Sequence, residues 1–209
     1  MRIGIFGGSF NPIHLGHTAL AAYICEQGLV DEVWLMVSPQ NPLKQDLTLL
    51  DENERLAMAR LAVAPYPMLR ACNFEFTLPR PSYTYHTLQA LRTAYPDHEF
   101  SLIIGEDNWN NFHRWYRGDD IVRETPIIVY PRSSENSEHS EHSEHSESTK
   151  ELSTYKHQLS ILENSPILPY SSTEIRNIIA HGKDASHMLH PDVAKYITEK
   201  QHYTQPIQL

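Results

Sequence analysis

One stretch of this chain decides its fold: Gly4-Ile5-Phe6-Gly7-Gly8-Ser9-Phe10-Asn11-Pro12-Ile13-His14-Leu15-Gly16-His17. It opens with a short apolar run, residues 2–6, of the kind that a buried parallel strand shows. Gly7-Gly8 ends this run where the backbone must turn sharply or approach a ligand closely. Asn11-Pro12 favours a turn, and apolar residues then recur at helical spacing from a start near His14. The stretch therefore predicts a strand, a phosphate-binding loop and a helix.

The start of this helix faces the carboxyl end of the strand. Free backbone N–H groups and the positive end of the helix dipole meet there, which favours an anion such as a phosphate. His14 and His17 are three residues apart, so they share a face of the first turn, and each can donate to a phosphate oxygen. Ordinary surface histidines and a zinc pair are the alternatives, although no third metal ligand is evident nearby. The glycines miss the GxGxxG spacing of dinucleotide-binding folds.

Length and composition suit one α/β domain. A chain of 209 residues with 40% hydrophobic content can bury a full core. Cys25 and Cys72 are its only cysteines, which argues against a disulfide framework. There is no apolar run of membrane-spanning length and no leader before the first strand, so we expect a cytoplasmic protein without a membrane partner. The net charge of −9 disfavours a nucleic-acid partner bound through a basic surface.

Residues 133–151 differ sharply in composition from the rest of the chain. They repeat Ser, Glu and His and contain no aromatic or aliphatic residue, so they cannot bury a core. Six Glu against one Lys give this segment −5 of the net charge of −9, which leaves −4 for the remainder. We expect a disordered surface insertion within a single domain, residues 1–209. Weak binding of a transition metal by its histidines is the alternative.

Strand and helix signals alternate along the rest of the chain. Buried strands are expected at 33–37, 70–76, 100–104 and 126–130, where apolar runs are followed by turn residues. Capping patterns begin two of the helices, Asp51 with Glu54 and Ser171 with Glu174. The sequence therefore predicts an α/β fold with a Rossmann-like parallel sheet flanked by helices on both faces, and with a small C-terminal helical segment.

Polar residues follow three of these strands at the edge where ligands gather in parallel sheets. Lys44 lies in the loop after 33–37, where it is either a solvated side chain or a phosphate contact. Asp107 follows 100–104, and its carboxylate either accepts from ribose hydroxyls or caps the next helix. Arg132 lies just beyond 126–130. Thr84, near the start of a helix that runs to about Tyr95, is either a cap or an anion contact.

Four motifs carry a resemblance to a known family. The GxFxPxHxGH pattern, Gly8 to His17, resembles the signature of the HxGH nucleotidyltransferase superfamily, which also includes class I aminoacyl-tRNA synthetases. Ser-x-Thr-x-x-Arg at 171–176 is similar to the second phosphate motif of that superfamily. Pro-Ser-Tyr-Thr at 81–84 and GxD-x4-F-x2-W from Gly105 resemble the bacterial nicotinate-nucleotide adenylyltransferases. The resemblance covers nearly the whole chain outside the insertion. Leu43 stands where the family usually has His.

This resemblance implies an activity in NAD biosynthesis, the transfer of AMP from ATP to nicotinate mononucleotide to give deamido-NAD and pyrophosphate. Mg²⁺ would arrive with the ATP, and no resident metal is expected. The implied catalytic residues are His14, His17 and Arg176. The implied ATP-binding residues are Gly7, Gly8, Ser9, Phe10, His14, Gly16, His17, Ser171, Ser172, Thr173 and Arg176. The implied acceptor-binding residues are Lys44, Thr84, Gly105, Asp107, Trp115, Tyr116 and Arg132.

Backbone N–H groups near Thr84 and Tyr116 would hold the nicotinate carboxylate, and Trp115 would stack on the pyridine ring; the alternative for Trp115 is core packing.

Two other functions stay open. The chain could be another adenylyltransferase of the superfamily, with nicotinamide mononucleotide or phosphopantetheine as acceptor, or a non-catalytic nucleotide sensor. A synthetase is disfavoured because the chain has no room for a tRNA-binding domain. The oligomeric state stays open, a homo-oligomer included.

The composition of the insertion generates a first prediction. Replacing residues 133–151 by a short linker should leave activity and melting temperature nearly unchanged, because a segment without apolar residues contributes no core. Thermal unfolding and turnover of the shortened chain measure this. A large loss of either would mean that the segment folds onto the domain.

Overall fold

The computed structural model describes residues 1–39, 49–131, 159–162, 165–166 and 169–204. Its described strands form one parallel sheet of six, in the order β3-β2-β1-β4-β5-β6. The strands are β1 (Arg2–Gly8), β2 (Glu32–Val37), β3 (Leu69–Cys72), β4 (Glu99–Gly105), β5 (Ile127–Tyr130) and β6 (Leu159–Ile161). The direction of winding reverses between β1 and β4, and the carboxyl ends of these two strands mark the edge where a ligand is expected.

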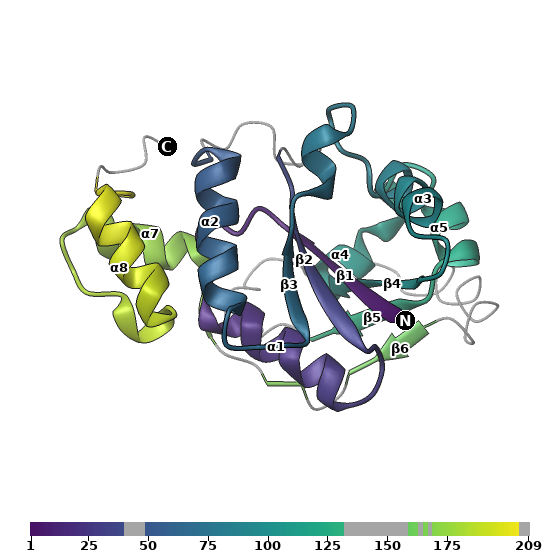
Figure 1. The fold of residues 1–209 in the computed structure, drawn as a ribbon, viewed down its shortest axis with the longest axis horizontal. Helices are drawn as coiled ribbons and strands as arrows, with labels where there is room; N and C mark the ends of the chain where they lie inside the picture. The colour runs from purple at the N-terminus through teal and green to yellow at the C-terminus, as the bar shows by residue number, and fades with distance from the viewer. Residues whose placement is uncertain (40–48, 132–158, 163–164, 167–168, 205–209) are drawn as a thin grey trace, which may run out of the picture.

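Helices cover both faces of this sheet, which confirms the predicted fold class. The described α-helices are α1 (Leu15–Glu26), α2 (Glu52–Val63), α3 (Thr84–Ala94), α4 (Glu106–Asn110), α5 (Gly118–Glu124), α7 (Ser172–Ala180) and α8 (Pro191–Lys200). Figure 1 shows α1 and α2 on one side of the sheet and α3 and α5 on the other. The predicted C-terminal helical segment is α7 with α8, and it lies beyond α2 (Figure 1).

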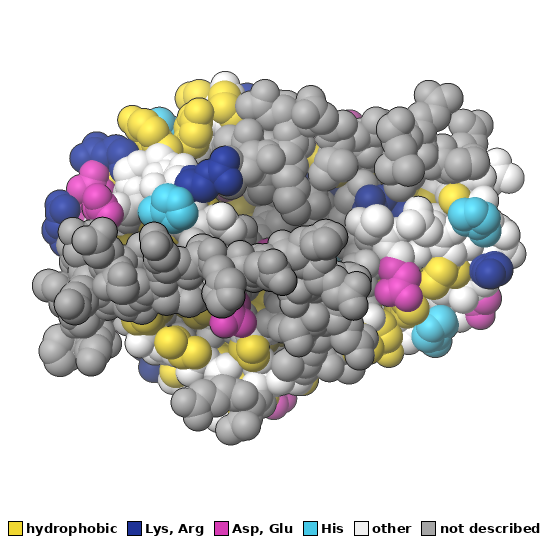
Figure 2. All heavy atoms as spheres, turned by 180° about the vertical axis from the view of Figure 1, so that it is seen from behind, with side chains coloured by type: hydrophobic (Ala, Val, Ile, Leu, Met, Phe, Trp, Pro, Cys, Tyr) yellow, Lys and Arg dark blue, Asp and Glu magenta, His cyan; other side chains and the backbone are white. Residues whose placement is uncertain are grey.

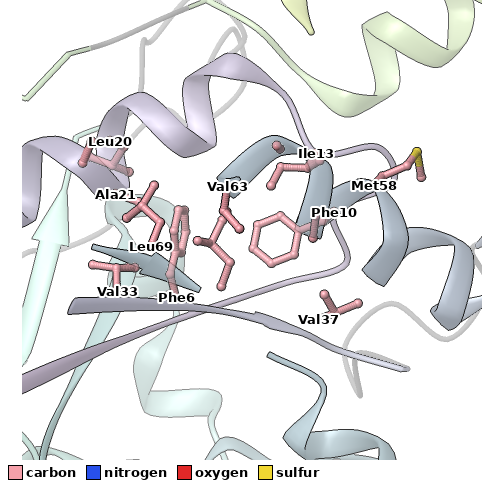
Figure 3. Close-up of a cluster of buried hydrophobic side chains, with 14 of the residues drawn as sticks. Phe6, Phe10, Ile13, Leu20, Ala21, Val33, Val37, Met58, Val63 and Leu69 are labelled. Carbon is pink, nitrogen blue, oxygen red and sulfur yellow. The ribbon is translucent and has the colours of Figure 1, made fainter. Parts of the chain in front are cut away.

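Successive side chains of the strands point to opposite faces of the sheet and so belong to two separate hydrophobic cores, as the pleat of a strand requires. Phe6, Leu35 and other side chains on one face pack with residues of α1 and α2, and this core also takes in Ile175 of α7. Figure 3 shows Phe6 and Phe10 within this cluster, next to Val63 of α2. The intervening residues of the strands, such as Ile5, point to the other face and pack with α3 and α5.

The predicted strand at 70–76 is wrong in its second half. β3 ends at Cys72, and Phe74–Thr77 forms a 3₁₀ turn, η1. The reason is the carboxylate of Glu75, which is buried and accepts hydrogen bonds from Ser38 Oγ (2.8 Å) and Thr87 Oγ1 (2.9 Å). A continued strand would not hold these bonds, because they join η1 to the end of β2 and to α3.

The face drawn in Figure 2 carries charges of both signs. At the end with α3 and α5, positively and negatively charged side chains lie next to one another (Figure 2). Ion pairs here include Arg92 with Glu124 and Arg123 with Asp120, both at 3.0 Å. In the part of the chain that the structure describes, no helix is long and apolar enough to cross a membrane.

Glu54 fastens the C-terminal helix α8 to α2. Its Oε2 accepts hydrogen bonds from His202 Nε2 (2.9 Å) and from the hydroxyl of Tyr196 (2.8 Å). The bond from His202 first, and that from Tyr196 second, hold the pKa of the Glu54 carboxyl below its usual value. Glu54 therefore stabilises the fold above the carboxyl's unfolded pKa, and this stability is lost as pH falls through its lower folded pKa.

Replacing Glu54 by Gln should lower the melting temperature at pH 7, and the difference from wild type should shrink as pH falls through the lowered pKa of the folded carboxyl group, where the carboxylate protonates. Melting curves between pH 3 and 7 measure this. Glu199→Gln, which removes an exposed carboxylate of α8 at 3.9 Å from Lys195, is the control and should change little. A constant difference across the pH range would contradict this role of Glu54.

Candidate active site

The loop after β1 takes a backbone path that most sequences avoid. Phe10 lies in the left-handed region, with φ 45°, although its ring is 2% exposed and packs edge-on against Phe6 at 5.9 Å between centroids. A Cβ on Gly8 would lie 3.0 Å from this ring, so glycine is the residue that fits there. An aromatic residue at positive φ is strained and persists only where its surroundings fix it.

Arg55 of α2 supplies the first of those restraints. Its guanidinium is 1% exposed and donates to four backbone carbonyl oxygens, those of Ser9 (2.6 Å), Ser38 (2.8 Å), Pro39 (3.2 Å) and Leu50 (2.8 Å). Burial lowers the pKa of Arg55, but a guanidinium stays charged in proteins. This one side chain ties the loop after β1 to the loop after β2.

Arg55 was not among the predicted site residues, because the helix that begins at Asp51 was predicted from its capping pattern alone. A signal was present. Arg55, Met58, Ala59 and Ala62 follow i, i+3, i+4, i+7 spacing and are all buried, so an arginine occupies the N-terminal end of an apolar helix face. A charge in such a place needs several hydrogen-bond partners.

Helix α7 supplies the second set of restraints. Ser172 Oγ donates to the carbonyl of Pro12 (2.8 Å), and Arg176 Nη1 donates to the carbonyl of Asn11 (2.8 Å). The predicted cap is confirmed, since Ser171 Oγ accepts from the backbone N–H of Glu174 at 3.1 Å. The N-terminus of α7 therefore lies against the loop that leads into α1.

The two histidines lie together at the start of α1, as predicted. Their rings are stacked, with centroids 3.6 Å apart, and His14 is the N-cap. His17 Nδ1 accepts from the backbone N–H of His14 at 3.2 Å. In a neutral ring Nε2 then carries the hydrogen, so His17 is held in the tautomer that donates from Nε2. Two helix N-termini and two imidazoles thus meet in one place, which suits a polyphosphate.

A cavity of about 160 Å³ opens beside this loop, at the carboxyl ends of β1 and β4. Gly7 and Gly8 border it on the side of the loop. The predicted acceptor residues Thr84, Gly105, Trp115 and Tyr116 line it as well. Thr84 is the first residue of α3, as expected for an anion contact at a helix start.

Ser82 and Trp115 line this cavity, and each has a buried polar atom, Ser82 Oγ and Trp115 Nε1, without a hydrogen-bond partner among the described residues. Trp115 stacks on Phe112 with centroids 4.8 Å apart, so its indole both packs on the protein and borders the cavity. Buried groups of this kind usually find a hydrogen bond, and a ligand can supply it. Burial raises the pKa of Glu75, which also lines the cavity.

Comparisons with known proteins agree with this geometry. A family model described as cytidylyltransferase-like matches residues 5–178. A Bacteroides fragilis protein named "Probable nicotinate-nucleotide adenylyltransferase" is 47% identical over 199 residues, covering 95% of this chain and 92% of that protein. A Flavobacterium johnsoniae protein of the same name is 40% identical over 203 residues, covering 97% and 99%. The chain belongs to the nicotinate-nucleotide adenylyltransferase family.

Solved structures share the fold of this family member. The Plasmodium falciparum nicotinic acid mononucleotide adenylyltransferase complexed with NaAD superposes with a TM-score of 0.76, at 20% identity and with 98% of each chain covered. At this identity the likeness concerns the fold.

The structure brings most of the predicted site residues of this adenylyltransferase family member to one edge of the sheet. Asp107, in contrast, is exposed in the first turn of α4 and is not among the residues that line the cavity. Lys44 and Arg132 lie outside the described residues, as do Leu43 and the insertion at 133–151. The roles of all these residues stay predictions.

Arg55 generates a prediction on stability. Arg55→Met should lower the free energy of unfolding by roughly 3 kcal/mol or more, because four backbone carbonyls, three of them part-buried and one buried, lose a charged donor. Urea unfolding measures this. Arg60→Met, at an exposed position of the same helix, is the matched control and should stay within about 0.5 kcal/mol of wild type. Equal effects of the two substitutions would contradict the role of Arg55.

Proposed function

We propose that this chain transfers AMP from ATP to nicotinate mononucleotide, giving deamido-NAD and pyrophosphate, in the cytoplasm. The observation that carries the proposal is a cavity at the carboxyl ends of β1 and β4. It is bordered by Gly7 and Gly8 of the phosphate loop and by Thr84, Trp115 and Tyr116 of the acceptor motifs. A donor and an acceptor bound there would meet at the start of α1.

The reaction needs no general base from the protein. The nucleophile is a phosphate oxygen of the mononucleotide, and because the second pKa of a phosphate monoester is about 6, it is already ionised near pH 7. This oxygen attacks the α-phosphorus of ATP in line with the α–β bridging oxygen. The new P–O bond forms as the bond to the bridging oxygen breaks, and pyrophosphate leaves with that electron pair.

Catalysis then consists of positioning and charge neutralisation. We assign this task to His14 and His17 on the α- and β-phosphates, together with Arg176 and the N-termini of α1 and α7. Mg²⁺ enters with the ATP as part of the substrate, held through its phosphate oxygens.

The acceptor assignment rests on the residues that line the cavity. Thr84, at the start of α3, offers its backbone N–H to a carboxylate, and Tyr116 offers a second. The rings of Tyr116 and Tyr83 lie 5.0 Å apart, so the segment that follows η2 (Phe112–Arg114) packs on the residue before α3. Trp115 is placed to stack on a pyridine ring.

His17 generates a prediction on catalysis. His17→Ala should lower kcat roughly 10²–10³-fold with the fold intact, because it removes one preorganised donor to the reacting phosphates. His181→Ala, at the far end of α7 from the loop, is the matched control and should keep wild-type turnover. Near-normal kcat in His17→Ala would contradict the mechanism; circular dichroism checks the fold of both variants.

Pyrophosphate release tests the function itself. The enzyme is given ATP and Mg²⁺ with nicotinate mononucleotide, nicotinamide mononucleotide or phosphopantetheine in parallel. We expect strong preference for the nicotinate acceptor. Turnover with one of the other acceptors alone would keep the phosphate site and overturn the acceptor assignment. Nucleotide binding without pyrophosphate from any acceptor would instead indicate a sensor.

A further inference from the structure

We propose that Tyr203, beyond the end of the last helix, is a positioning residue for the phosphate loop. Its hydroxyl donates to the side-chain oxygen Oδ1 of Asn11 at 2.8 Å, across 192 residues of sequence. Asn11 is 2% exposed and lies in the middle of the loop between β1 and α1. Tyr203 touches no reacting atom in this proposal, which rests on the proposed function and acts through Asn11.

Asn11 is held from three directions. Its Oδ1 accepts from Tyr203 and from the backbone N–H of Leu50 (3.4 Å), and its carbonyl oxygen accepts from Arg176 (2.8 Å). These donors come from the C-terminal segment, from the residues before α2 and from α7. The side chain and the backbone of Asn11 are therefore fixed together, one residue after the strained Phe10 and three residues before His14.

The backbone conformation of residues 201–203, after α8, places this hydroxyl next to Asn11. Gln201 and Tyr203 both have positive φ, 54° and 61°, so two of these three residues are in the left-handed region within one turn. His202 between them is bound to Glu54 of α2 at 2.9 Å. An aromatic residue at φ 61° is costly, and such conformations cluster where function requires them. Burial raises the pKa of Tyr203, so its hydroxyl keeps its proton and remains a donor.

The consequence concerns turnover more than stability. Losing the hydroxyl leaves the Oδ1 of Asn11 with only the longer bond from Leu50 (3.4 Å), so the loop gains freedom where His14 and His17 must meet the phosphates. One neutral hydrogen bond corresponds to roughly 3–10-fold in a rate if it is used to hold the reacting geometry.

Two phenylalanine variants separate positioning from packing. Tyr203→Phe and Tyr196→Phe each remove one hydroxyl that donates at 2.8 Å, but the acceptor of Tyr196 is Glu54, which lies outside the loop. We expect Tyr203→Phe to lower kcat roughly 3–10-fold and to speed hydrogen–deuterium exchange in a peptide covering residues 9–17. Tyr196→Phe should leave kcat and the exchange of residues 9–17 at the wild-type level. It should lower the melting temperature by about as much as Tyr203→Phe does.

The two readouts keep this proposal apart from the proposed function. Unchanged exchange in Tyr203→Phe would overturn the positioning role whatever reaction the enzyme catalyses. Faster exchange with wild-type kcat, or an equal loss of kcat in Tyr196→Phe, would overturn it as well. Failure of the wild-type enzyme to release pyrophosphate would contradict only the proposed function, and the exchange data would still decide whether Tyr203 fixes the loop.

Discussion

The buried guanidinium of Arg55, bound to four carbonyl oxygens, is the interaction on which the rest of the site depends. Together with Arg176 and Ser172 it engages the carbonyls of Ser9, Asn11 and Pro12, reaching across 46, 165 and 160 residues of sequence. A loop with an aromatic residue at positive φ would not keep its shape alone. The restraints on the phosphate loop therefore come from both α2 and α7.

The position of α7 and α8 beside the phosphate loop has a hydrophobic cause. Ile175 and Val193 are fully buried in the core that also covers Phe6 and Phe10, so hydrophobic packing carries the C-terminal helices to the loop. The polar contacts then set the geometry: hydrophobic burial is strong but non-directional, whereas hydrogen bonds specify position. The same division holds on the other face of the sheet, where Glu75 joins the end of β2 to α3 beside the acceptor cavity.

The sequence was sufficient for five of the six described strands and for the family, because these follow from apolar periodicity and local motifs, whereas β6 was not predicted. The proximity of His14 and His17 at the start of α1 followed from their spacing, whereas the stacking of their rings was not predicted. The contacts that position the motifs did not follow, since Arg55, Tyr203 and Glu75 reach their partners only through the tertiary fold. Glu75 also ended a strand that its apolar neighbours predicted to continue. An arginine in an apolar helix face was the one local sign of this network.

An enzyme built in this way should catalyse by holding two substrates rather than by proton transfer, so that AMP moves from ATP to the acceptor. Tracing the α-phosphate tests this most directly. With ATP labelled at the α-phosphorus and nicotinate mononucleotide, the account predicts that all consumed label appears in deamido-NAD and none in pyrophosphate. Label accumulating as free AMP, or remaining in ATP while the enzyme is saturated with both substrates, would contradict it.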